Sequence, residues 1–270
     1  MNGSSIGIMD SGIGGLIVHN HIKALLPGER LIYVADTAYC PYGTRPVEDI
    51  RSRCKAITRF LLARQCKIIV IACNTATAAA IETLRDTFRE TLIVGMEPAV
   101  KPAVLHTQSG VVGVLATRGT FQGSLYNRTL ATFAGKVQVL EQVGEGWVEA
   151  VEKGAYDTSE TEEMVRKTIQ PMIDAGVDHL VLGCTHYPFL VPVIRRIAGP
   201  GVVIVDPAPA VARRVAWLLT EKGWLAESSM SDQDLYYTSC KDTSVLPSAV
   251  PNAAKGGTIN WSPYTFENME

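Results

Sequence analysis

Short runs of Ile and Val residues alternate along the chain with segments of helix length. In the first hundred residues these runs cover residues 5–9, 31–35, 67–72 and 92–96. Runs that are apolar throughout, rather than at every second position, are typical of strands buried on both faces of a parallel sheet. The helix-length segments between them, such as 47–65 and 75–90, complete β-α-β units. The pattern therefore predicts an α/β fold.

The same succession of strands and helices recurs in the second part of the chain. Its apolar runs cover residues 111–115, 137–140, 178–182 and 202–205. Gly113 lies 106 residues after Gly7, and Cys184 lies 111 residues after Cys73. This offset is too long for a solenoid repeat. It predicts two similar, pseudo-duplicated α/β domains, each with a parallel sheet, and an active site in the cleft between them.

Two prolines mark the predicted domain boundaries. The chain leaves the first domain near Pro98 and returns near Pro207, after which the sequence predicts a helix over 208–222 and a strand over 234–239. We therefore expect a first domain of residues 1–97 and 208–270 and a second of residues 98–207. Beyond Cys240 the chain is rich in Ser, Pro, Gly and Asn, which predicts a surface-wrapping or flexible extension.

Charge and hydropathy exclude several classes of protein. The 25 basic and 27 acidic residues give a net charge of −2, which argues against a nucleic-acid binder. The run 68–73 is far too short to span a membrane, and the amino terminus lacks the basic region of a signal peptide. We expect a cytoplasmic protein without nucleic-acid or membrane partners. There the six cysteines, with no C-x-x-C pair, would be free thiols rather than disulfides or metal ligands.

Two cysteines follow equivalent predicted strands. A single cysteine at a strand end is usually a small buried apolar residue, and we assign Cys54 and Cys66 to the core and Cys40 to the cleft lining at most. Cys73 and Cys184, in contrast, would face one cleft from opposite sides. Donors at a helix N-terminus lower the pKa of such thiols. Two opposed acid/base groups suit removal of a proton from one face of a carbon and its return to the other face.

Polar residues at the same predicted strand ends surround these cysteines. Asp10 either caps a helix or turn, or places a carboxylate at the mouth of the cleft, and the glycines after it allow close approach of an anionic ligand. His186 either has a structural role or supports proton transfer at Cys184. The residues that either cap helices and turns or bind a substrate carboxylate are Tyr42, Gly43, Asn74, Thr75 and Thr185, and the ATRGT segment adds Thr117 and Thr120 where Ser11 stands in the first half.

Four segments together resemble the cofactor-independent glutamate racemases of the aspartate/glutamate racemase family. They are DSGIGGL, ADTAYCPYGTR, ACNTATA and GCTHYPFL, in this order, and the resemblance extends from about residue 5 to about residue 239. It implies that Cys73 and Cys184 are the two catalytic bases, that Asp10 and His186 assist the thiols, and that Glu152 in VEAVEKG is the assisting glutamate of the second domain. The substrate-binding residues it implies are Asp10, Ser11, Tyr42, Gly43, Asn74, Thr75, Thr185 and His186.

The resemblance also implies an activity. It is a two-base racemisation of L-glutamate to D-glutamate that supplies peptidoglycan synthesis, carried out by a homodimer without cofactor or metal. The sequence carries no lysine motif for a pyridoxal Schiff base. The cleft must therefore desolvate a thiolate, hold the α-carbon between the two sulfur atoms and surround the carboxylate with donors.

Other functions stay open at this point. An aspartate or other amino-acid racemase is the nearest alternative, although aspartate-acting relatives tend to carry an acidic residue where His186 stands. A decarboxylase or lyase with one cysteine is disfavoured by the presence of both Cys73 and Cys184. A non-catalytic two-domain ligand-binding protein of the secreted kind would need an export signal. A hydrolase using Cys184 and His186 is less favoured because neighbouring loop positions rarely face each other.

Overall fold

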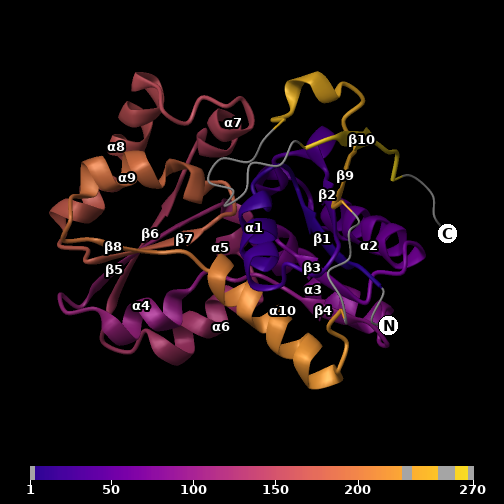
Figure 1. Cartoon of the computed structure of the whole chain (residues 1–270). Helices are drawn as coiled ribbons and strands as arrows, with labels where there is room; N and C mark the ends of the chain where they lie inside the picture. The colour runs from indigo at the N-terminus through magenta and orange to yellow at the C-terminus, as the bar shows by residue number, and fades with distance from the viewer. Residues whose placement is uncertain (1–3, 227–232, 249–258, 267–270) are drawn as a thin grey trace.

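Two parallel β-sheets form the cores of two lobes (Figure 1). The computed structural model describes residues 4–226, 233–248 and 259–266. Within these ranges the strands of the first sheet are β1 (Ile6–Asp10), β2 (Leu31–Ala35), β3 (Ile68–Ile71), β4 (Leu92–Val94), β9 (Leu235–Thr238) and β10 (Trp261–Pro263). The strands of the second sheet are β5 (Val111–Ala116), β6 (Gln138–Val143), β7 (His179–Gly183) and β8 (Val203–Val205).

The two sheets repeat one strand order. The first reads β10-β9-β2-β1-β3-β4 and the second β6-β5-β7-β8, with every pair parallel. Removal of β9 and β10 leaves the same arrangement in both, with β1 equivalent to β5. Gly7 and Gly113 are both closely packed, because an added Cβ would lie 3.0 Å from Ile69 Cδ1 in one sheet and 2.7 Å from Leu180 Cδ2 in the other. The predicted fold of two similar parallel-sheet α/β domains is confirmed.

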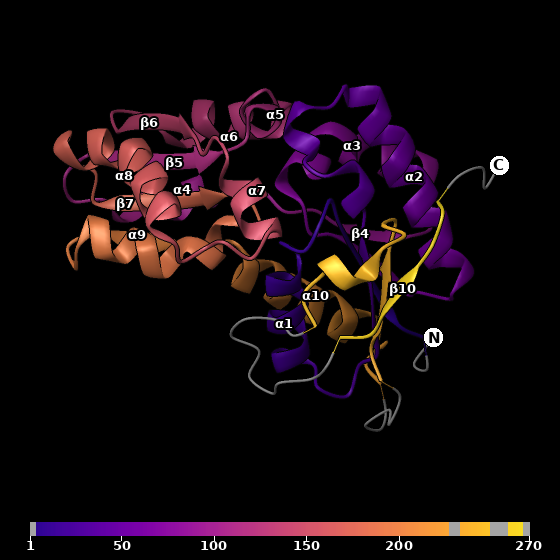
Figure 2. The same ribbon diagram turned by 90° about the horizontal axis from the view of Figure 1, so that it is seen from above.

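Helices cover both faces of each sheet (Figure 2). In α2, Ile50, Cys54, Ile57 and Leu61 recur every three or four residues and are buried, which turns one helix face to the core. The helices are α1 (Leu16–Leu25), α2 (Val47–Ala63), α3 (Asn74–Thr87), α4 (Val100–His106), α5 (Arg118–Phe121), α6 (Ser124–Phe133), α7 (Trp147–Glu152), α8 (Ser159–Asp174), α9 (Val191–Ala198) and α10 (Ala208–Lys222). None of those in the described part of the chain has the length and apolar character needed to cross a bilayer.

The chain returns to the first sheet after β8. Helix α10 packs beside α1, and β9 pairs with β2, at the position where the sequence predicts a strand. Beyond Cys240 the sequence predicted no regular element, yet β10 adds a parallel strand next to β9. Its Pro263 obscured the signal, because proline is accepted in a strand only at a sheet edge. Residues 249–258 and 267–270 of this segment lie outside the described residues, and we retain 1–97 plus 208–270 and 98–207 as proposed domain limits.

Candidate active site

The chemistry-bearing residues gather where parallel strands of the two sheets end. Asp10 is the last residue of β1, Cys73 lies two residues beyond β3, and Cys184 directly follows β7. Thr117 directly follows β5 and is the N-cap residue of α5. Ligands of open parallel sheets bind beyond these carboxyl ends. Here the ends of β1 and β7 meet, because the Thr185 hydroxyl donates a hydrogen bond to Asp10 Oδ1 at 3.1 Å.

Asp10 is fully enclosed at this junction. Its Oδ2 atom accepts a hydrogen bond from the Gly12 amide at 3.0 Å, and its Oδ1 atom accepts from Thr185. Burial raises the pKa of the carboxyl, against the lowering effects of the His186 charge and the Gly12 amide. Asp10 therefore serves as a turn acceptor and also places a carboxylate between the lobes, so the two roles considered from the sequence coexist.

Cys73 is the N-cap residue of α3. The Ala76 amide donates to its sulfur at 3.4 Å, and the Ser11 hydroxyl lies 3.7 Å from the same atom. From the helix terminus, the sequence predicted a lowered pKa for the Cys73 thiol. This prediction was wrong, because the net shift is upward. Burial, followed by the negative charge of Asp10, raises the pKa of Cys73 to about 12 and outweighs the Ala76 amide. A thiolate formed here is a strong base because water does not stabilise it.

Cys184 stands opposite, on the second lobe. It is almost fully buried, and its sulfur lies 3.8 Å from Nδ1 of His186. A negative charge on Cys184 also contributes to the raised pKa of Cys73, so the two sulfur atoms are near enough for their charges to interact. A two-base mechanism requires two such sulfur atoms on opposite sides of one carbon atom.

His186 links Cys184 to a carboxylate. Its Nε2 atom lies 2.5 Å from Glu152 Oε1, an atom that also accepts the Ile13 amide at 2.8 Å. Burial lowers the pKa of His186, whereas hydrogen bonds to Cys184, Cys40 and Glu152 raise it. The hydrogen bonds have the larger effect, and the net pKa is well above its ordinary value. Glu152 is the last residue of α7, and His186 lies in the loop after β7. The assignment of Glu152 as the assisting glutamate remains a prediction.

Hydroxyl groups from both lobes form a second cluster. Thr75 Oγ1 lies 2.8 Å from Thr117 Oγ1 and 3.4 Å from Thr120 Oγ1, and the last two atoms are 3.0 Å apart. The neighbouring Asn74 is buried, and its side-chain oxygen and nitrogen have no hydrogen-bond partner among the described residues. An unpaired buried amide costs about 1–3 kcal/mol, so this side chain is suited to a polar ligand.

The loop after β2 brings Gly43 to the second lobe. A Cβ atom on Gly43 would lie 3.0 Å from Thr117 Cβ, so a side chain here would have to displace Thr117 by a few tenths of an ångström. The side chain of Tyr42 is buried, and its hydroxyl donates to Asp36 Oδ2 at 2.5 Å. Asp36 also accepts two bonds from Arg53, at 2.9 and 2.7 Å. This buried pair is not evident from the sequence, because Arg53 lies outside the four segments and nothing local relates it to Asp36.

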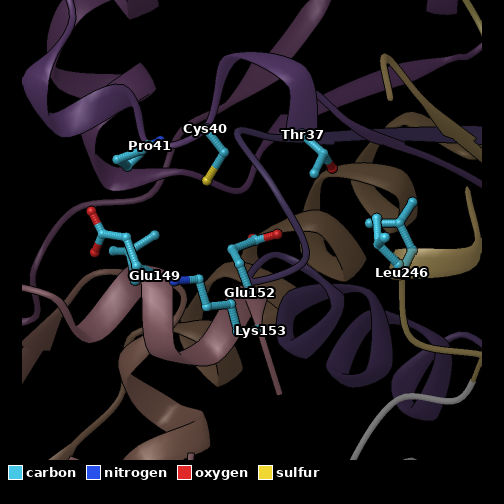
Figure 3. Close-up of a pocket in the computed structure, with 9 residues that line it drawn as sticks. Thr37, Cys40, Pro41, Glu149, Glu152, Lys153 and Leu246 are labelled. Atoms are coloured by element: carbon cyan, nitrogen blue, oxygen red, sulfur yellow. The ribbon is translucent and has the colours of Figure 1, made fainter. Parts of the chain in front are cut away.

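A cavity of about 440 Å³ is lined by Cys40 and Glu152, the two residues that bond to His186 from outside its own loop. Figure 3 shows Cys40 and Thr37 on one wall, from the loop after β2, and Glu149, Glu152 and Lys153 on the other, at the end of α7. Leu246 from the C-terminal segment closes one side. Cys40 thus lines the cleft, as the sequence indicated, but its contact with His186 was not foreseen.

Comparison with known proteins identifies the family. The family model for Asp/Glu/hydantoin racemases matches residues 6–215. A glutamate racemase from Roseiflexus sp. (strain RS-1) is 50% identical over 218 residues, which are 81% of this chain and 80% of the relative.

Two solved structures are also similar. The glutamate racemase isoform RacE1 from Bacillus anthracis superimposes with a TM-score of 0.81 at 32% identity, over 91% of this chain and 92% of that one. The Escherichia coli glutamate racemase was solved with L-glutamate and the activator UDP-MurNAc-ala. It superimposes with a TM-score of 0.79 at 32% identity, over 88% of this chain and 90% of that one. This chain therefore belongs to the Asp/Glu/hydantoin racemase family.

Proposed function

We propose that this protein is a glutamate racemase that interconverts L- and D-glutamate with Cys73 and Cys184 as its two bases. The observation that carries the proposal is the placement of these cysteines at equivalent strand ends of two sheets with one strand order. The names of the relatives support the choice of substrate, and the Escherichia coli relative was solved with L-glutamate.

The reaction exchanges one proton for another. A thiolate on one cysteine removes the α-proton of glutamate and becomes a thiol, while the thiol of the other cysteine donates its proton to the opposite face of the carbanion and becomes a thiolate. The configuration inverts and the total number of protons is unchanged. A thiol pKa of about 12 at Cys73 makes its conjugate base strong enough to assist with a weakly acidic C–H bond.

The polar residues around the sulfur atoms bind the substrate in this proposal. The Asn74 amide and the hydroxyls of Thr75 and Thr117 donate to a carboxylate and stabilise charge as the carbanion develops. Asp10 accepts from the substrate ammonium group. The remaining proposed contacts come from Ser11, Tyr42, Gly43, Thr120, Thr185 and His186.

The cellular role follows from the product. D-glutamate made in the cytoplasm would supply peptidoglycan synthesis, and we propose that the active form is a homodimer. Light scattering during gel filtration tests the proposed homodimer. We expect a mass twice the 29.2 kDa of one chain. A monomeric mass at assay concentration would refute the dimer alone.

Isotope exchange tests the activity. We expect the purified protein, freed of metals and pyridoxal phosphate, to deuterate the α-position of L-glutamate in D₂O, as seen by NMR, with loss of circular dichroism. The double variant Cys73→Ala/Cys184→Ala serves as the inactive control. Exchange with L-aspartate instead of L-glutamate would identify an aspartate racemase, and exchange with no amino acid would end the racemase proposal.

A further inference from the structure

Cys40, Glu152 and His186 form a cluster of three metal-ligating side chains. One ligand atom of each lies within 4.8 Å of the other two. Cys40 follows β2 in the first sheet, whereas Glu152 ends α7 and His186 follows β7 in the second lobe. The cluster therefore spans the cleft between the two sheets. Cys40 and Glu152 are half-buried and His186 is buried.

We propose that this cluster binds a divalent transition-metal ion of the Zn²⁺ type and thereby regulates the active site. Thiolate, imidazole and carboxylate are the side chains that Zn²⁺ selects, at about 2.3, 2.0–2.1 and 2.0–2.2 Å, so ligand atoms around a tetrahedral ion lie about 3.3–3.7 Å apart. Small side-chain movements bring the three atoms to these separations.

The neighbouring cavity supplies access and a fourth ligand. Cys40 and Glu152 both line the space of about 440 Å³, on facing walls in Figure 3. An ion can therefore enter from solvent, and water can complete the coordination. The three ligands leave one position open, which is the usual arrangement of a zinc site that is not purely structural. The three residues are far apart along the chain, so the sequence alone does not predict a metal site here.

Metal binding changes what His186 can do. Its Nε2 atom now contacts Glu152 Oε1 at 2.5 Å, and the ion takes the place of the hydrogen between them, so that this proton and the thiol proton of Cys40 both pass to solvent. Nδ1, which lies 3.8 Å from Cys184 Sγ, must then carry the hydrogen of the neutral ring. The ion therefore removes the second ring proton, and the metal-bound ring cannot take it up again.

The same ion also ties the two lobes together. Cys40 comes from one sheet edge and the other two ligands from the opposite one, so opening of the cleft would require loss of a metal–ligand bond. If the protein is the racemase proposed above, on which this consequence rests, Zn²⁺ inhibits it. Mg²⁺ has no such effect, because it prefers oxygen ligands over sulfur and nitrogen.

Spectroscopy tests the site without reference to activity. We expect the metal-free full chain to bind one Co²⁺ with a thiolate-to-metal charge-transfer band that Zn²⁺ removes and Mg²⁺ does not. Cys40→Ser abolishes the band and weakens Zn²⁺ binding by more than about 100-fold, because even outer contacts of a metal ligand contribute 10–100-fold. Cys240→Ser, the matched control at another half-exposed thiol, leaves both unchanged. The absence of binding, or an unchanged band and affinity in Cys40→Ser, overturns the site.

Rate measurements then test the regulation. We expect Zn²⁺ to inhibit racemisation of L-glutamate by the unmodified chain, and Cys40→Ser to lose this inhibition when each protein's rate with Zn²⁺ is divided by its own metal-free rate. Equal inhibition of both proteins would place the inhibitory ion elsewhere and refute the proposal. Co²⁺ binding through Cys40 in a protein that racemises no amino acid would refute the proposed function and leave the metal site intact.

Discussion

The Thr185 hydroxyl donates a hydrogen bond to the Asp10 carboxylate across the boundary between the two lobes. The 3.1 Å contact joins the carboxyl ends of β1 and β7, which carry separate parts of the proposed site. Both side chains are buried, so water does not replace the bond when it is lost. This bond therefore sets the relative position of the strand ends that hold Asp10 and Cys184.

Replacement of Thr185 by valine tests this role. The change keeps the shape of the side chain and removes the donor, leaving Asp10 with fewer partners for its charge. A hydrogen bond to a charged group contributes about 1.5–3 kcal/mol, so we expect kcat/KM for L-glutamate to fall about 10- to 150-fold. Thr168→Val, which removes a hydroxyl in α8 that bonds only to its own helix, is the control with near-normal activity. Equal rates in the two variants would contradict the role given to Thr185.

Each cysteine of the proposed catalytic pair is tested by conversion to serine. A positioned acid or base contributes about 10²- to 10⁴-fold, so Cys73→Ser and Cys184→Ser should each lose at least this much of the racemisation rate. Circular dichroism at a wavelength that reports glutamate configuration measures the rate. Cys240→Ser should match the unmodified chain, because its sulfur lies at the start of the C-terminal segment and bonds to the Asp242 carbonyl. Wild-type activity in either active-site variant would remove that sulfur from the mechanism.

The sequence sufficed for the strands because a strand buried on both faces must be apolar throughout. That requirement also revealed the repeat, since Cys73 and Cys184 end strands that share an equivalent place in both sheets. The edge strand β10 was missed because an edge needs less burial and accepts Pro263. The C-terminal segment therefore has more regular structure than its composition indicates.

Contacts between residues far apart in the sequence limit how much of the site can be predicted from the sequence. Cys40, Glu152 and His186 meet only after both sheets have folded, and no local spacing relates them. The raised pKa of Cys73 has a similar origin. The helix terminus that lowers this pKa can be predicted from the local sequence, whereas the burial that raises it is a property of the tertiary structure. Local motifs located the groups, and packing determined their chemistry.

The buried pair of Asp36 and Arg53 supports the Tyr42–Gly43 turn. Removal of one partner leaves an uncompensated charge, and we expect Asp36→Ala to lower the free energy of unfolding by about 3–5 kcal/mol. The milder Tyr42→Phe removes one hydrogen bond and should lower it by about 1 kcal/mol. Urea denaturation measures both.

An exposed ion pair provides the comparison for this prediction. Glu48 and Arg51 pair on the surface of α2, and Glu48→Ala should change the free energy of unfolding by about 0–1 kcal/mol. If Asp36→Ala were no more destabilising than Glu48→Ala, the buried pair would not support the turn.

The raised pKa of Cys73 predicts how its reactivity depends on pH. Only the thiolate reacts with iodoacetamide, and the thiolate fraction rises about tenfold per pH unit below the pKa. With a pKa of about 12, alkylation of Cys73 should therefore increase with unit slope from about pH 7 to about pH 10. A cysteine in an unfolded peptide should level off near its ordinary pKa of about 8.5. Mass spectrometry of the peptide that contains Cys73 gives the rate. A plateau near pH 8.5 in the folded protein would mean that burial does not control this thiol.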